Sequence, residues 1–116
     1  MKIHRLYTDD KGESHFAEAE VEYVETTQAG RLSKRLPASG IIFREVPPTY
    51  DLDWHPAPRR QFVIILSGRL EIGLGDGTKQ VFGPGDARLV EDTTGKGHTT
   101  RVVGNEPVVT ATVPLA

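Results

Sequence analysis

The sequence predicts an all-β protein built as a sandwich or barrel, and three features of the chain carry this prediction. Apolar and polar residues alternate with a period of two along most segments, as in strands buried on one face. The 12 glycines and 8 prolines are spread along the chain, which indicates turns between short elements. Every candidate helical window is interrupted by glycine, proline or strand-like alternation. About eight to ten short strands at this spacing are typical of a sandwich or barrel.

The expected strands follow from this alternation, and two junctions carry further detail. Residues 61–66 are apolar on both faces, which predicts a central strand covered on each side. Ser67-Gly68 predicts a two-residue hairpin to the next strand, because glycine supplies the positive φ of a tight turn. Gly75-Asp76-Gly77 predicts the turn after that. In chain order we expect strands at residues 14–26, 40–46, 51–55, 61–66, 69–74, 78–82, 87–91, 98–103 and 108–113.

Length, charge and composition limit the class of protein. The 116 residues predict one domain over residues 1–116. A net charge of −2 is not the excess of positive charge that proteins use to bind nucleic acid or a membrane surface. The longest apolar run, 62–66, is far too short for a membrane span, and no signal-peptide core follows Met1. The absence of cysteine excludes disulfides and thiolate chemistry. We therefore expect a soluble, cytoplasmic protein with no nucleic-acid or membrane partner.

Two of the four histidines stand where an expected strand meets a loop. His55 ends the segment 51–55, and strand alternation places Asp53 and His55 on one face, with Trp54 on the other. Trp54 is expected to pack in a core or in a dimer contact. His4 and His15, in contrast, are expected to be ordinary surface or edge residues without polar company.

His98 opens a strand after a glycine-rich loop, and Gln61 opens the central strand. Strand alternation directs both side chains into the barrel, above apolar residues on the same faces. An apolar cavity with a few polar groups at one end is the common design of a small-ligand site. The alternative is that the barrel is filled by its own side chains.

These residues resemble the two sequence motifs of the cupin superfamily. In the first, G(X)5HXH(X)3-4E(X)6G, His55 matches the first histidine, Ala57 stands at the second, Gln61 stands at the glutamate and Gly68 keeps the spacing. In the second, G(X)5PXG(X)2H(X)3N, Gly85-Asp86 provides the opening turn, Gly95 to His98 keeps the G(X)2H spacing, and Val102 stands at the asparagine. The resemblance covers about residues 40–113, preceded by strands in 1–39. It implies a cupin-type jelly-roll β-barrel.

Metal-binding cupins hold one divalent ion, such as Fe, Mn, Zn or Ni, with histidines and a glutamate. The resemblance implies His55, Gln61 and His98 as the ligands here, with Asp53 as a substitute carboxylate. Glu91 and Asp92 are further candidates. Two imidazoles and a neutral amide leave the charge of the ion unbalanced in a low-dielectric barrel. A metal-free site, in which the histidines hydrogen-bond to Gln61 or Asp53, therefore stays equally open.

Two functions follow from the resemblance. One is an enzyme of the oxygenase, isomerase or lyase type acting on a small molecule, with or without the metal. His55 and His98 would be its catalytic residues, and its ligand-binding residues would be Gln61, Asp53, Arg59 and Thr100. The other is a non-catalytic cupin that binds or senses a ligand. We also expect a homodimer that pairs through the alternating segment 14–26.

Overall fold

The computed structural model describes residues 1–116 as β-strands joined by turns and loops, without a helix. The prediction of an all-β chain is therefore confirmed. No helix capable of spanning a membrane is present. The strands are β1 (Lys2–Thr8), β2 (Ser14–Glu20), β3 (Tyr23–Thr27), β4 (Gly30–Ser33), β5 (Ile42–Val46), β6 (Asp51–His55), β7 (Gln61–Ser67), β8 (Leu70–Gly73), β9 (Lys79–Phe82), β10 (Ala87–Val90), β11 (His98–Val102) and β12 (Val108–Pro114).

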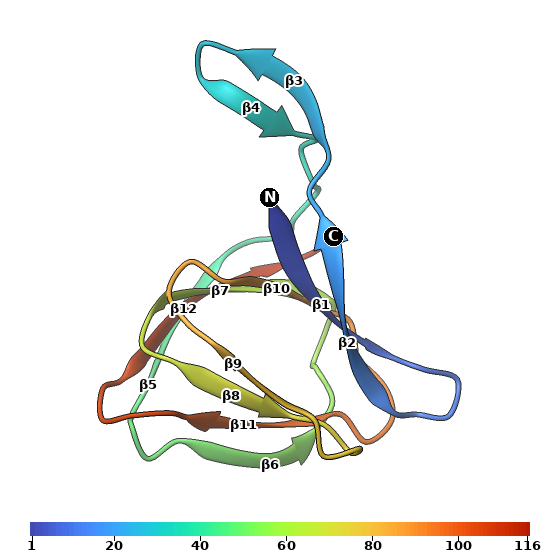
Figure 1. Ribbon diagram of the computed structural model, residues 1–116, viewed down its shortest axis with the longest axis vertical. Coiled ribbons are helices and arrows are strands. Elements are labelled where there is room, and N and C mark those ends of the chain that lie inside the picture. The colour runs from blue at the N-terminus through green and yellow to red at the C-terminus, as the bar shows by residue number, and fades with distance from the viewer.

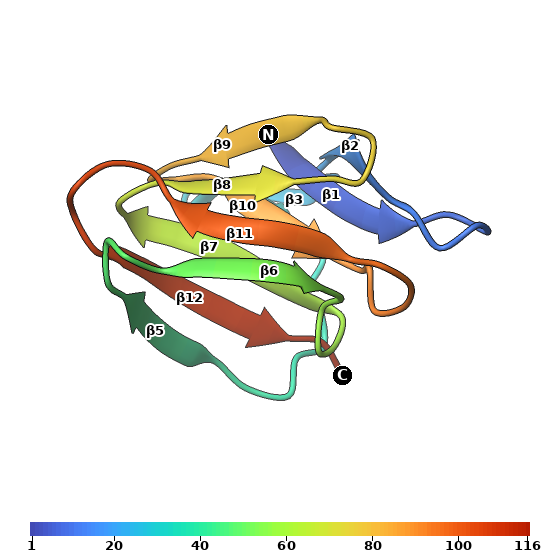
Figure 2. The same ribbon diagram turned by 90° about the horizontal axis from the view of Figure 1, so that it is seen from below.

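Two sheets face each other and form the body of the molecule (Figures 1 and 2). The larger has six strands in the order β2-β1-β10-β7-β12-β5, and the smaller has four in the order β6-β11-β8-β9. All pairs are antiparallel except β1 with β10, which is parallel. Successive strands such as β5 and β6, or β9 and β10, lie in different sheets. The chain therefore crosses repeatedly between the two layers and encloses one interior.

The interior between the sheets is a packed apolar core. Leu6, Ile72, Phe82 and Val108 come from four different strands, and none of them has exposed surface. Fully burying a side chain of this kind contributes about 1.5–3 kcal/mol. This core fixes the separation of the two sheets. It therefore also fixes the positions of the inward-facing side chains near the ends of the sheets.

The turn at Gly68 is not the predicted hairpin. β7 pairs with β10 and β12, whereas β8 pairs with β9 and β11, so Gly68 carries the chain from one sheet to the other. Its φ is +79°, and a β-carbon there would lie 2.5 Å from the Pro107 carbonyl oxygen. Glycine is needed at this corner for both reasons. The hairpin predicted at Gly75 to Gly77 is present between β8 and β9.

The central strand β7 is covered on one face only. Gln61, Val63 and Ile65 are buried toward the interior, whereas Phe62 and Ile64 are half-buried on the outer face and Leu66 is 48% exposed. The expectation that both faces are covered is therefore wrong. An apolar strand can be central in its sheet because of its pairing while one of its faces stays open.

The expected N-terminal strand is divided. β2 pairs with β1, and the chain then leaves the body to form the separate hairpin β3–β4, which projects from it in Figure 1. A cleft of about 810 Å³ lies between this hairpin and the outer face of β7, and its apolar lining includes Val24, Leu32, Leu36, Phe62 and Ile64.

Candidate functional site

A cavity of about 340 Å³ opens where β6, β11 and the start of β7 meet. This volume is at the lower end of the range for small-molecule sites. Its walls carry His55, His98, Arg44 and Arg88, and no aspartate or glutamate. The remaining lining residues are apolar, hydroxyl-bearing or amide side chains. The cavity can therefore take a small ligand, and its wall carries imidazole and guanidinium groups but no carboxylate.

His98 is buried and held by a carboxylate. Its Nδ1 lies 2.6 Å from Oδ2 of Asp92, which has no exposed surface and also accepts a hydrogen bond of 2.8 Å from Ser14 Oγ. An ionised carboxylate only accepts, so the ring proton is assigned to Nδ1 and donated to Asp92. Nε2 is then the free nitrogen, and it is the atom that His98 offers to a ligand in the cavity.

His55 is held in the same tautomer by a different acceptor. Its Nδ1 lies 2.7 Å from the backbone carbonyl of Asp53, so Nδ1 donates and Nε2 keeps its lone pair. Its ring centroid is 4.5 Å from that of His98. Burial disfavours the imidazolium, and this keeps the pKa of His55 below its usual value of 6.5. The cavity therefore presents two imidazoles side by side, each held through Nδ1 and each with no hydrogen bond at Nε2.

Glycine places the loop that carries Asp92 and His98. Gly97 has φ +77°, and a β-carbon on it would lie 1.9 Å from the carbonyl oxygen of His55. The backbone amide of Ala57 donates to the Asp92 carbonyl at 2.9 Å. Strand β6 and this loop thus meet backbone to backbone, and only glycine permits the approach.

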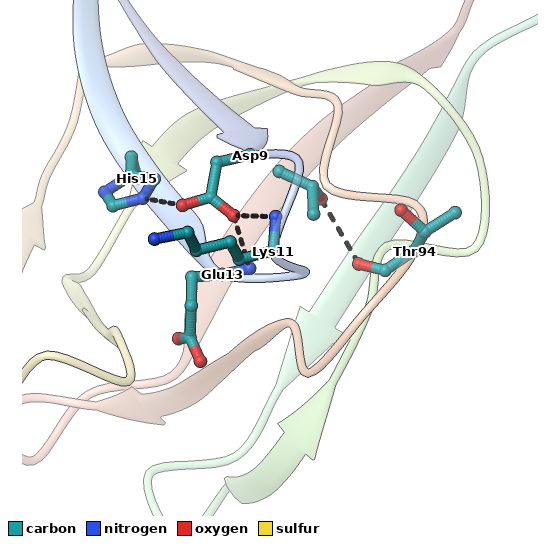
Figure 3. Close-up of polar contacts among 6 residues, drawn as sticks. Asp9, Lys11, Glu13, His15 and Thr94 are labelled. Atoms are coloured by element: carbon teal, nitrogen blue, oxygen red, sulfur yellow. Dashed lines mark hydrogen bonds and ion pairs between the residues drawn. The ribbon is translucent and has the colours of Figure 1, made fainter.

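The turn between β1 and β2 supports the same loop from the other side (Figure 3). Asp9 Oδ1 accepts hydrogen bonds from the amides of Lys11 and Glu13, and His15 Nε2 lies 2.7 Å from Asp9 Oδ2. The hydrogen bonds from the Glu13 amide and from His15 lower the pKa of Asp9 to about 2. Thr8 Oγ1 donates to the Thr94 carbonyl at 3.2 Å and so joins this turn to the loop.

The outer histidines do have polar company, contrary to expectation. His15 contacts Asp9, as just described, and His4 Nδ1 lies 3.2 Å from Gln80 Nε2. Neither residue lines the cavity.

Asp53 does not share a face with His55. In the pairing of β6 with β11, His55 lies opposite His98 and Leu52 lies opposite Thr100. An advance of three residues along β6 therefore matches an advance of two residues along β11. Such a bulge inverts the alternation on one side of it. Leu52 therefore lines the cavity with His55, while Asp53 is exposed and lies outside the lining. The expected set of Asp53, His55 and His98 is not formed.

The other predicted ligand-binding residues divide between the wall and its rim. Gln61 and Thr100 are buried and line the cavity, as the alternation predicted for Gln61. Arg59 lies outside the lining, but its Nη1 donates to Gln61 Oε1 at 3.1 Å and so fixes the amide. Ala57, at the position of the second motif histidine, is buried and presents only a methyl group.

Arg88 is the main site residue that the sequence reasoning missed. It is 95% buried, since only 5% of its surface is exposed, and it lines the cavity from β10. The signal was available, because Arg88 and Val90 share one face of an alternating strand and Val90 is a core residue.

The donors in the cavity do not fit a resident divalent ion. His55 and His98 supply two nitrogens, but no group of three or more histidine, aspartate or glutamate side chains is placed to hold a metal. Glu91 accepts hydrogen bonds from Arg5 Nε at 2.6 Å and from Arg60 Nε, and Asp92 is committed to Ser14 and His98. With arginines in the same wall, a dication has no charge compensation.

Trp54 lies in neither the core nor the cavity. It is 40% exposed, and Lys96 Nζ lies 4.0 Å from the centroid of its ring. The expectation of core packing is therefore wrong, and a dimer contact stays a prediction.

Comparisons with known proteins agree with this architecture. No curated protein matches the chain. Among solved structures, the cupin domain of Cnp3 from Schizosaccharomyces pombe is similar, with 17% identity, a TM-score of 0.51, and coverage of 100% of this chain and 83% of that chain. Protein NMB1881 from Neisseria meningitidis shares 18% identity, with a TM-score of 0.49 and coverage of 67% of this chain and 76% of that chain. A family model described as "Cupin domain" matches residues 42–114. This chain therefore belongs to the cupin domain family and has its all-β jelly-roll fold.

Proposed function

We propose that the chain is a small-molecule-binding cupin that carries out acid–base chemistry of the isomerase type, without a resident metal ion. The observation that carries the proposal is the hydrogen bond between Asp92 and His98, which is buried on both sides. A carboxylate that holds Nδ1 of a histidine orients the ring and stabilises the imidazolium formed when Nε2 takes a proton. A buried Asp–His pair that opens on a cavity is the arrangement of a general base.

The step that fits this geometry is the removal of a proton from a carbon next to a carbonyl. His98 Nε2 takes the proton, and the C–H electron pair moves through the new C=C bond onto the carbonyl oxygen. In a 2-hydroxy carbonyl compound the hydroxyl proton then passes to the new oxyanion, and return of the first proton from Nε2 to the former carbonyl carbon gives the isomer. Return of that proton to the original carbon gives back the substrate, so the step balances with no other reactant. His55, whose ring centroid lies 4.5 Å from that of His98, is placed to contact the same ligand.

Deuterium exchange tests the proposal without knowledge of the natural substrate. Small ketoses, aldoses and 2-oxo acids are incubated with the protein in D₂O, and loss of the C–H signal is followed by proton NMR. The expected result is exchange in at least one compound, slowed about 100-fold or more in His98→Ala. His15→Ala is the matched control, because it removes a histidine outside the cavity.

The alternatives predict different results in the same experiment. A non-catalytic binding module would show ligand-dependent thermal stabilisation and no exchange. A metal-dependent enzyme would show exchange only after addition of a divalent ion, and both His55→Ala and His98→Ala would lose it. Either outcome overturns the metal-free mechanism.

A further inference from the structure

The guanidinium of Arg88 is a buried charge without a partner. Its Nε and Nη1 are inaccessible and make no hydrogen bond. Its Cζ lies 4.9 Å from the centroid of the Phe82 ring, which is itself fully buried. Burial lowers the pKa of Arg88 to about 10, so the group is still charged at neutral pH. Burying a cation without a hydrogen-bonded counter-charge costs several kcal/mol of folding free energy. A bound ligand that supplies the negative charge would offset this cost.

The cavity wall around Arg88 carries positive charge and no carboxylate. Arg44 lines the same space, and its positive charge lowers the pKa values of both His55 and Arg88. Asp92 is the carboxylate whose charge acts on Arg88, but its Oδ2 is committed to Ser14 and His98, its buried Oδ1 makes no hydrogen bond, and it does not line the cavity. Two guanidinium groups therefore share the wall with no carboxylate opposite them.

We propose that Arg88 is the residue that recognises the ligand, and that the ligand is a small organic acid whose carboxylate pairs with the Arg88 guanidinium. This inference rests on the proposed function only in placing the ligand in the same cavity. A single guanidinium matches a planar carboxylate in shape and compensates one negative charge. A phosphate dianion would need a second buried cation, whereas Arg44 is exposed. The apolar residues that line the cavity suit the carbon body of such an acid.

The position of Arg88 also sets how the acid would lie. Arg88 pairs with Val63 across β10 and β7, and Val63 is on the same face as Gln61. His98 and His55 enter from β11 and β6, in the opposite sheet. A carboxylate on Arg88 would therefore hold the acid from the six-stranded sheet, while its carbon atoms face the imidazoles of the four-stranded sheet.

The test compares acids with their uncharged amides. Thermal stabilisation and calorimetric binding are measured with benzoate against benzamide, and with isobutyrate against isobutyramide. Each amide matches the shape of its acid but carries no charge. We expect both acids to bind and the amides to bind at least about tenfold more weakly, since the charge-assisted hydrogen bond to the guanidinium is lost.

The variant Arg88→Met tests the residue itself. Methionine fills similar space without a charge, so this variant is expected to fold, to have a higher melting temperature than wild type in the absence of ligand, and to bind benzoate at least about tenfold more weakly. Arg31→Met, on the projecting hairpin, is the matched control and should bind benzoate as wild type does. Equal affinity in Arg88→Met and wild type, equal affinity for acid and amide, or no binding of either acid would each overturn the inference.

One further variant separates this inference from the proposed function. His98→Ala should lose deuterium exchange but keep the preference for benzoate over benzamide, because that preference depends on Arg88. If exchange is absent but Arg88-dependent binding is present, the acid–base proposal fails alone. If neutral ketoses exchange in a His98-dependent way but no acid binds, the assignment of Arg88 fails alone.

Discussion

Gly97 and His55 are in backbone contact, and this contact joins the two halves of the candidate site. A β-carbon on Gly97 would lie 1.9 Å from the carbonyl oxygen of His55, far inside van der Waals contact. The distance between the His55 and His98 rings therefore depends on the absence of one methyl group.

Gly97→Ala should destabilise the protein and separate the two imidazoles. The positive φ alone costs about 1 kcal/mol for alanine, and the clash with the His55 carbonyl adds to it. Gly77→Ala is the matched control, since Gly77 has φ +89° and a β-carbon there meets nothing within 4 Å. Urea unfolding should show a clearly larger loss for Gly97→Ala. Equal losses would mean that the loop relaxes without cost.

Asp92→Ala should be among the most destabilising single substitutions near the cavity. It leaves Ser14 Oγ and His98 Nδ1 without their acceptor in a fully buried place, at a cost of about 3 kcal/mol. Ser14→Ala removes one donor and leaves the His98 bond, so it should cost about 1 kcal/mol. Chemical denaturation of both variants gives the comparison. If Ser14→Ala costs as much as Asp92→Ala, the His98 bond contributes little to stability.

The stability of the protein should fall in mild acid partly because of His55. Its pKa in the folded state lies below 6.5 because burial disfavours the charged ring, so the unfolded chain binds protons more readily. This contribution is complete above pH 6.5 and is lost as the pH falls toward the folded-state pKa. His55→Gln removes the group, and its melting temperature should fall less than that of wild type between pH 7.5 and 5.5. Parallel pH profiles would contradict this assignment.

Divalent ions should bind the site weakly or not at all, because the cavity offers two imidazole nitrogens and no carboxylate. Elemental analysis of tag-free protein is expected to find far less than one ion per chain. A chelator should leave the melting temperature unchanged. A near-stoichiometric metal that is lost in both His55→Ala and His98→Ala would contradict this and support the metal-dependent enzyme.

The homodimer expected from the N-terminal segment remains a prediction, and a second copy of this chain is the partner we propose for the cleft beside β3–β4. The hairpin provides complementary charges for a two-fold contact, with Glu22 and Glu25 at its first strand and Arg31, Lys34 and Arg35 at or just after its second. Sedimentation at low and high salt should show a dimer that weakens as salt rises. Leu32→Glu, at the cleft, should make the chain monomeric, whereas a wild-type monomer at low salt would exclude this contact.

Strand positions could be predicted from the sequence because a period of two is a local property. β6, β7 and β11 begin at the residues where the strands were expected to begin. Pairing is not local, and this explains the error at Gly68: the residue provides the same positive φ at a corner between sheets as in a hairpin. The bulge in β6 is set by its pairing with β11, so the face of Asp53 could not be known from β6 alone.

Arg88 shows a different limit. In the structure it shares the buried face of β10 with Val90, but from sequence alone a charged residue on such a face is usually assumed to escape to solvent or to find a partner. Only the three-dimensional arrangement reveals that no partner is present. The roles of Asp92 and Ser14 were hidden for a similar reason, because these residues are far apart along the chain and meet only when β2 packs beside the loop before β11.

The parallel pairing of β1 with β10 has a consequence for the way the protein is made. A ribosome releases the strand containing His4 long before it releases Arg88, the residue that His4 will face across the ladder. Until then β1 and β2 have only each other, and a lone two-stranded ribbon is marginally stable in water. Strands β1 and β2 are therefore synthesised before β10 but are among the last to find their place, and the wall that contains Arg88 is completed only then.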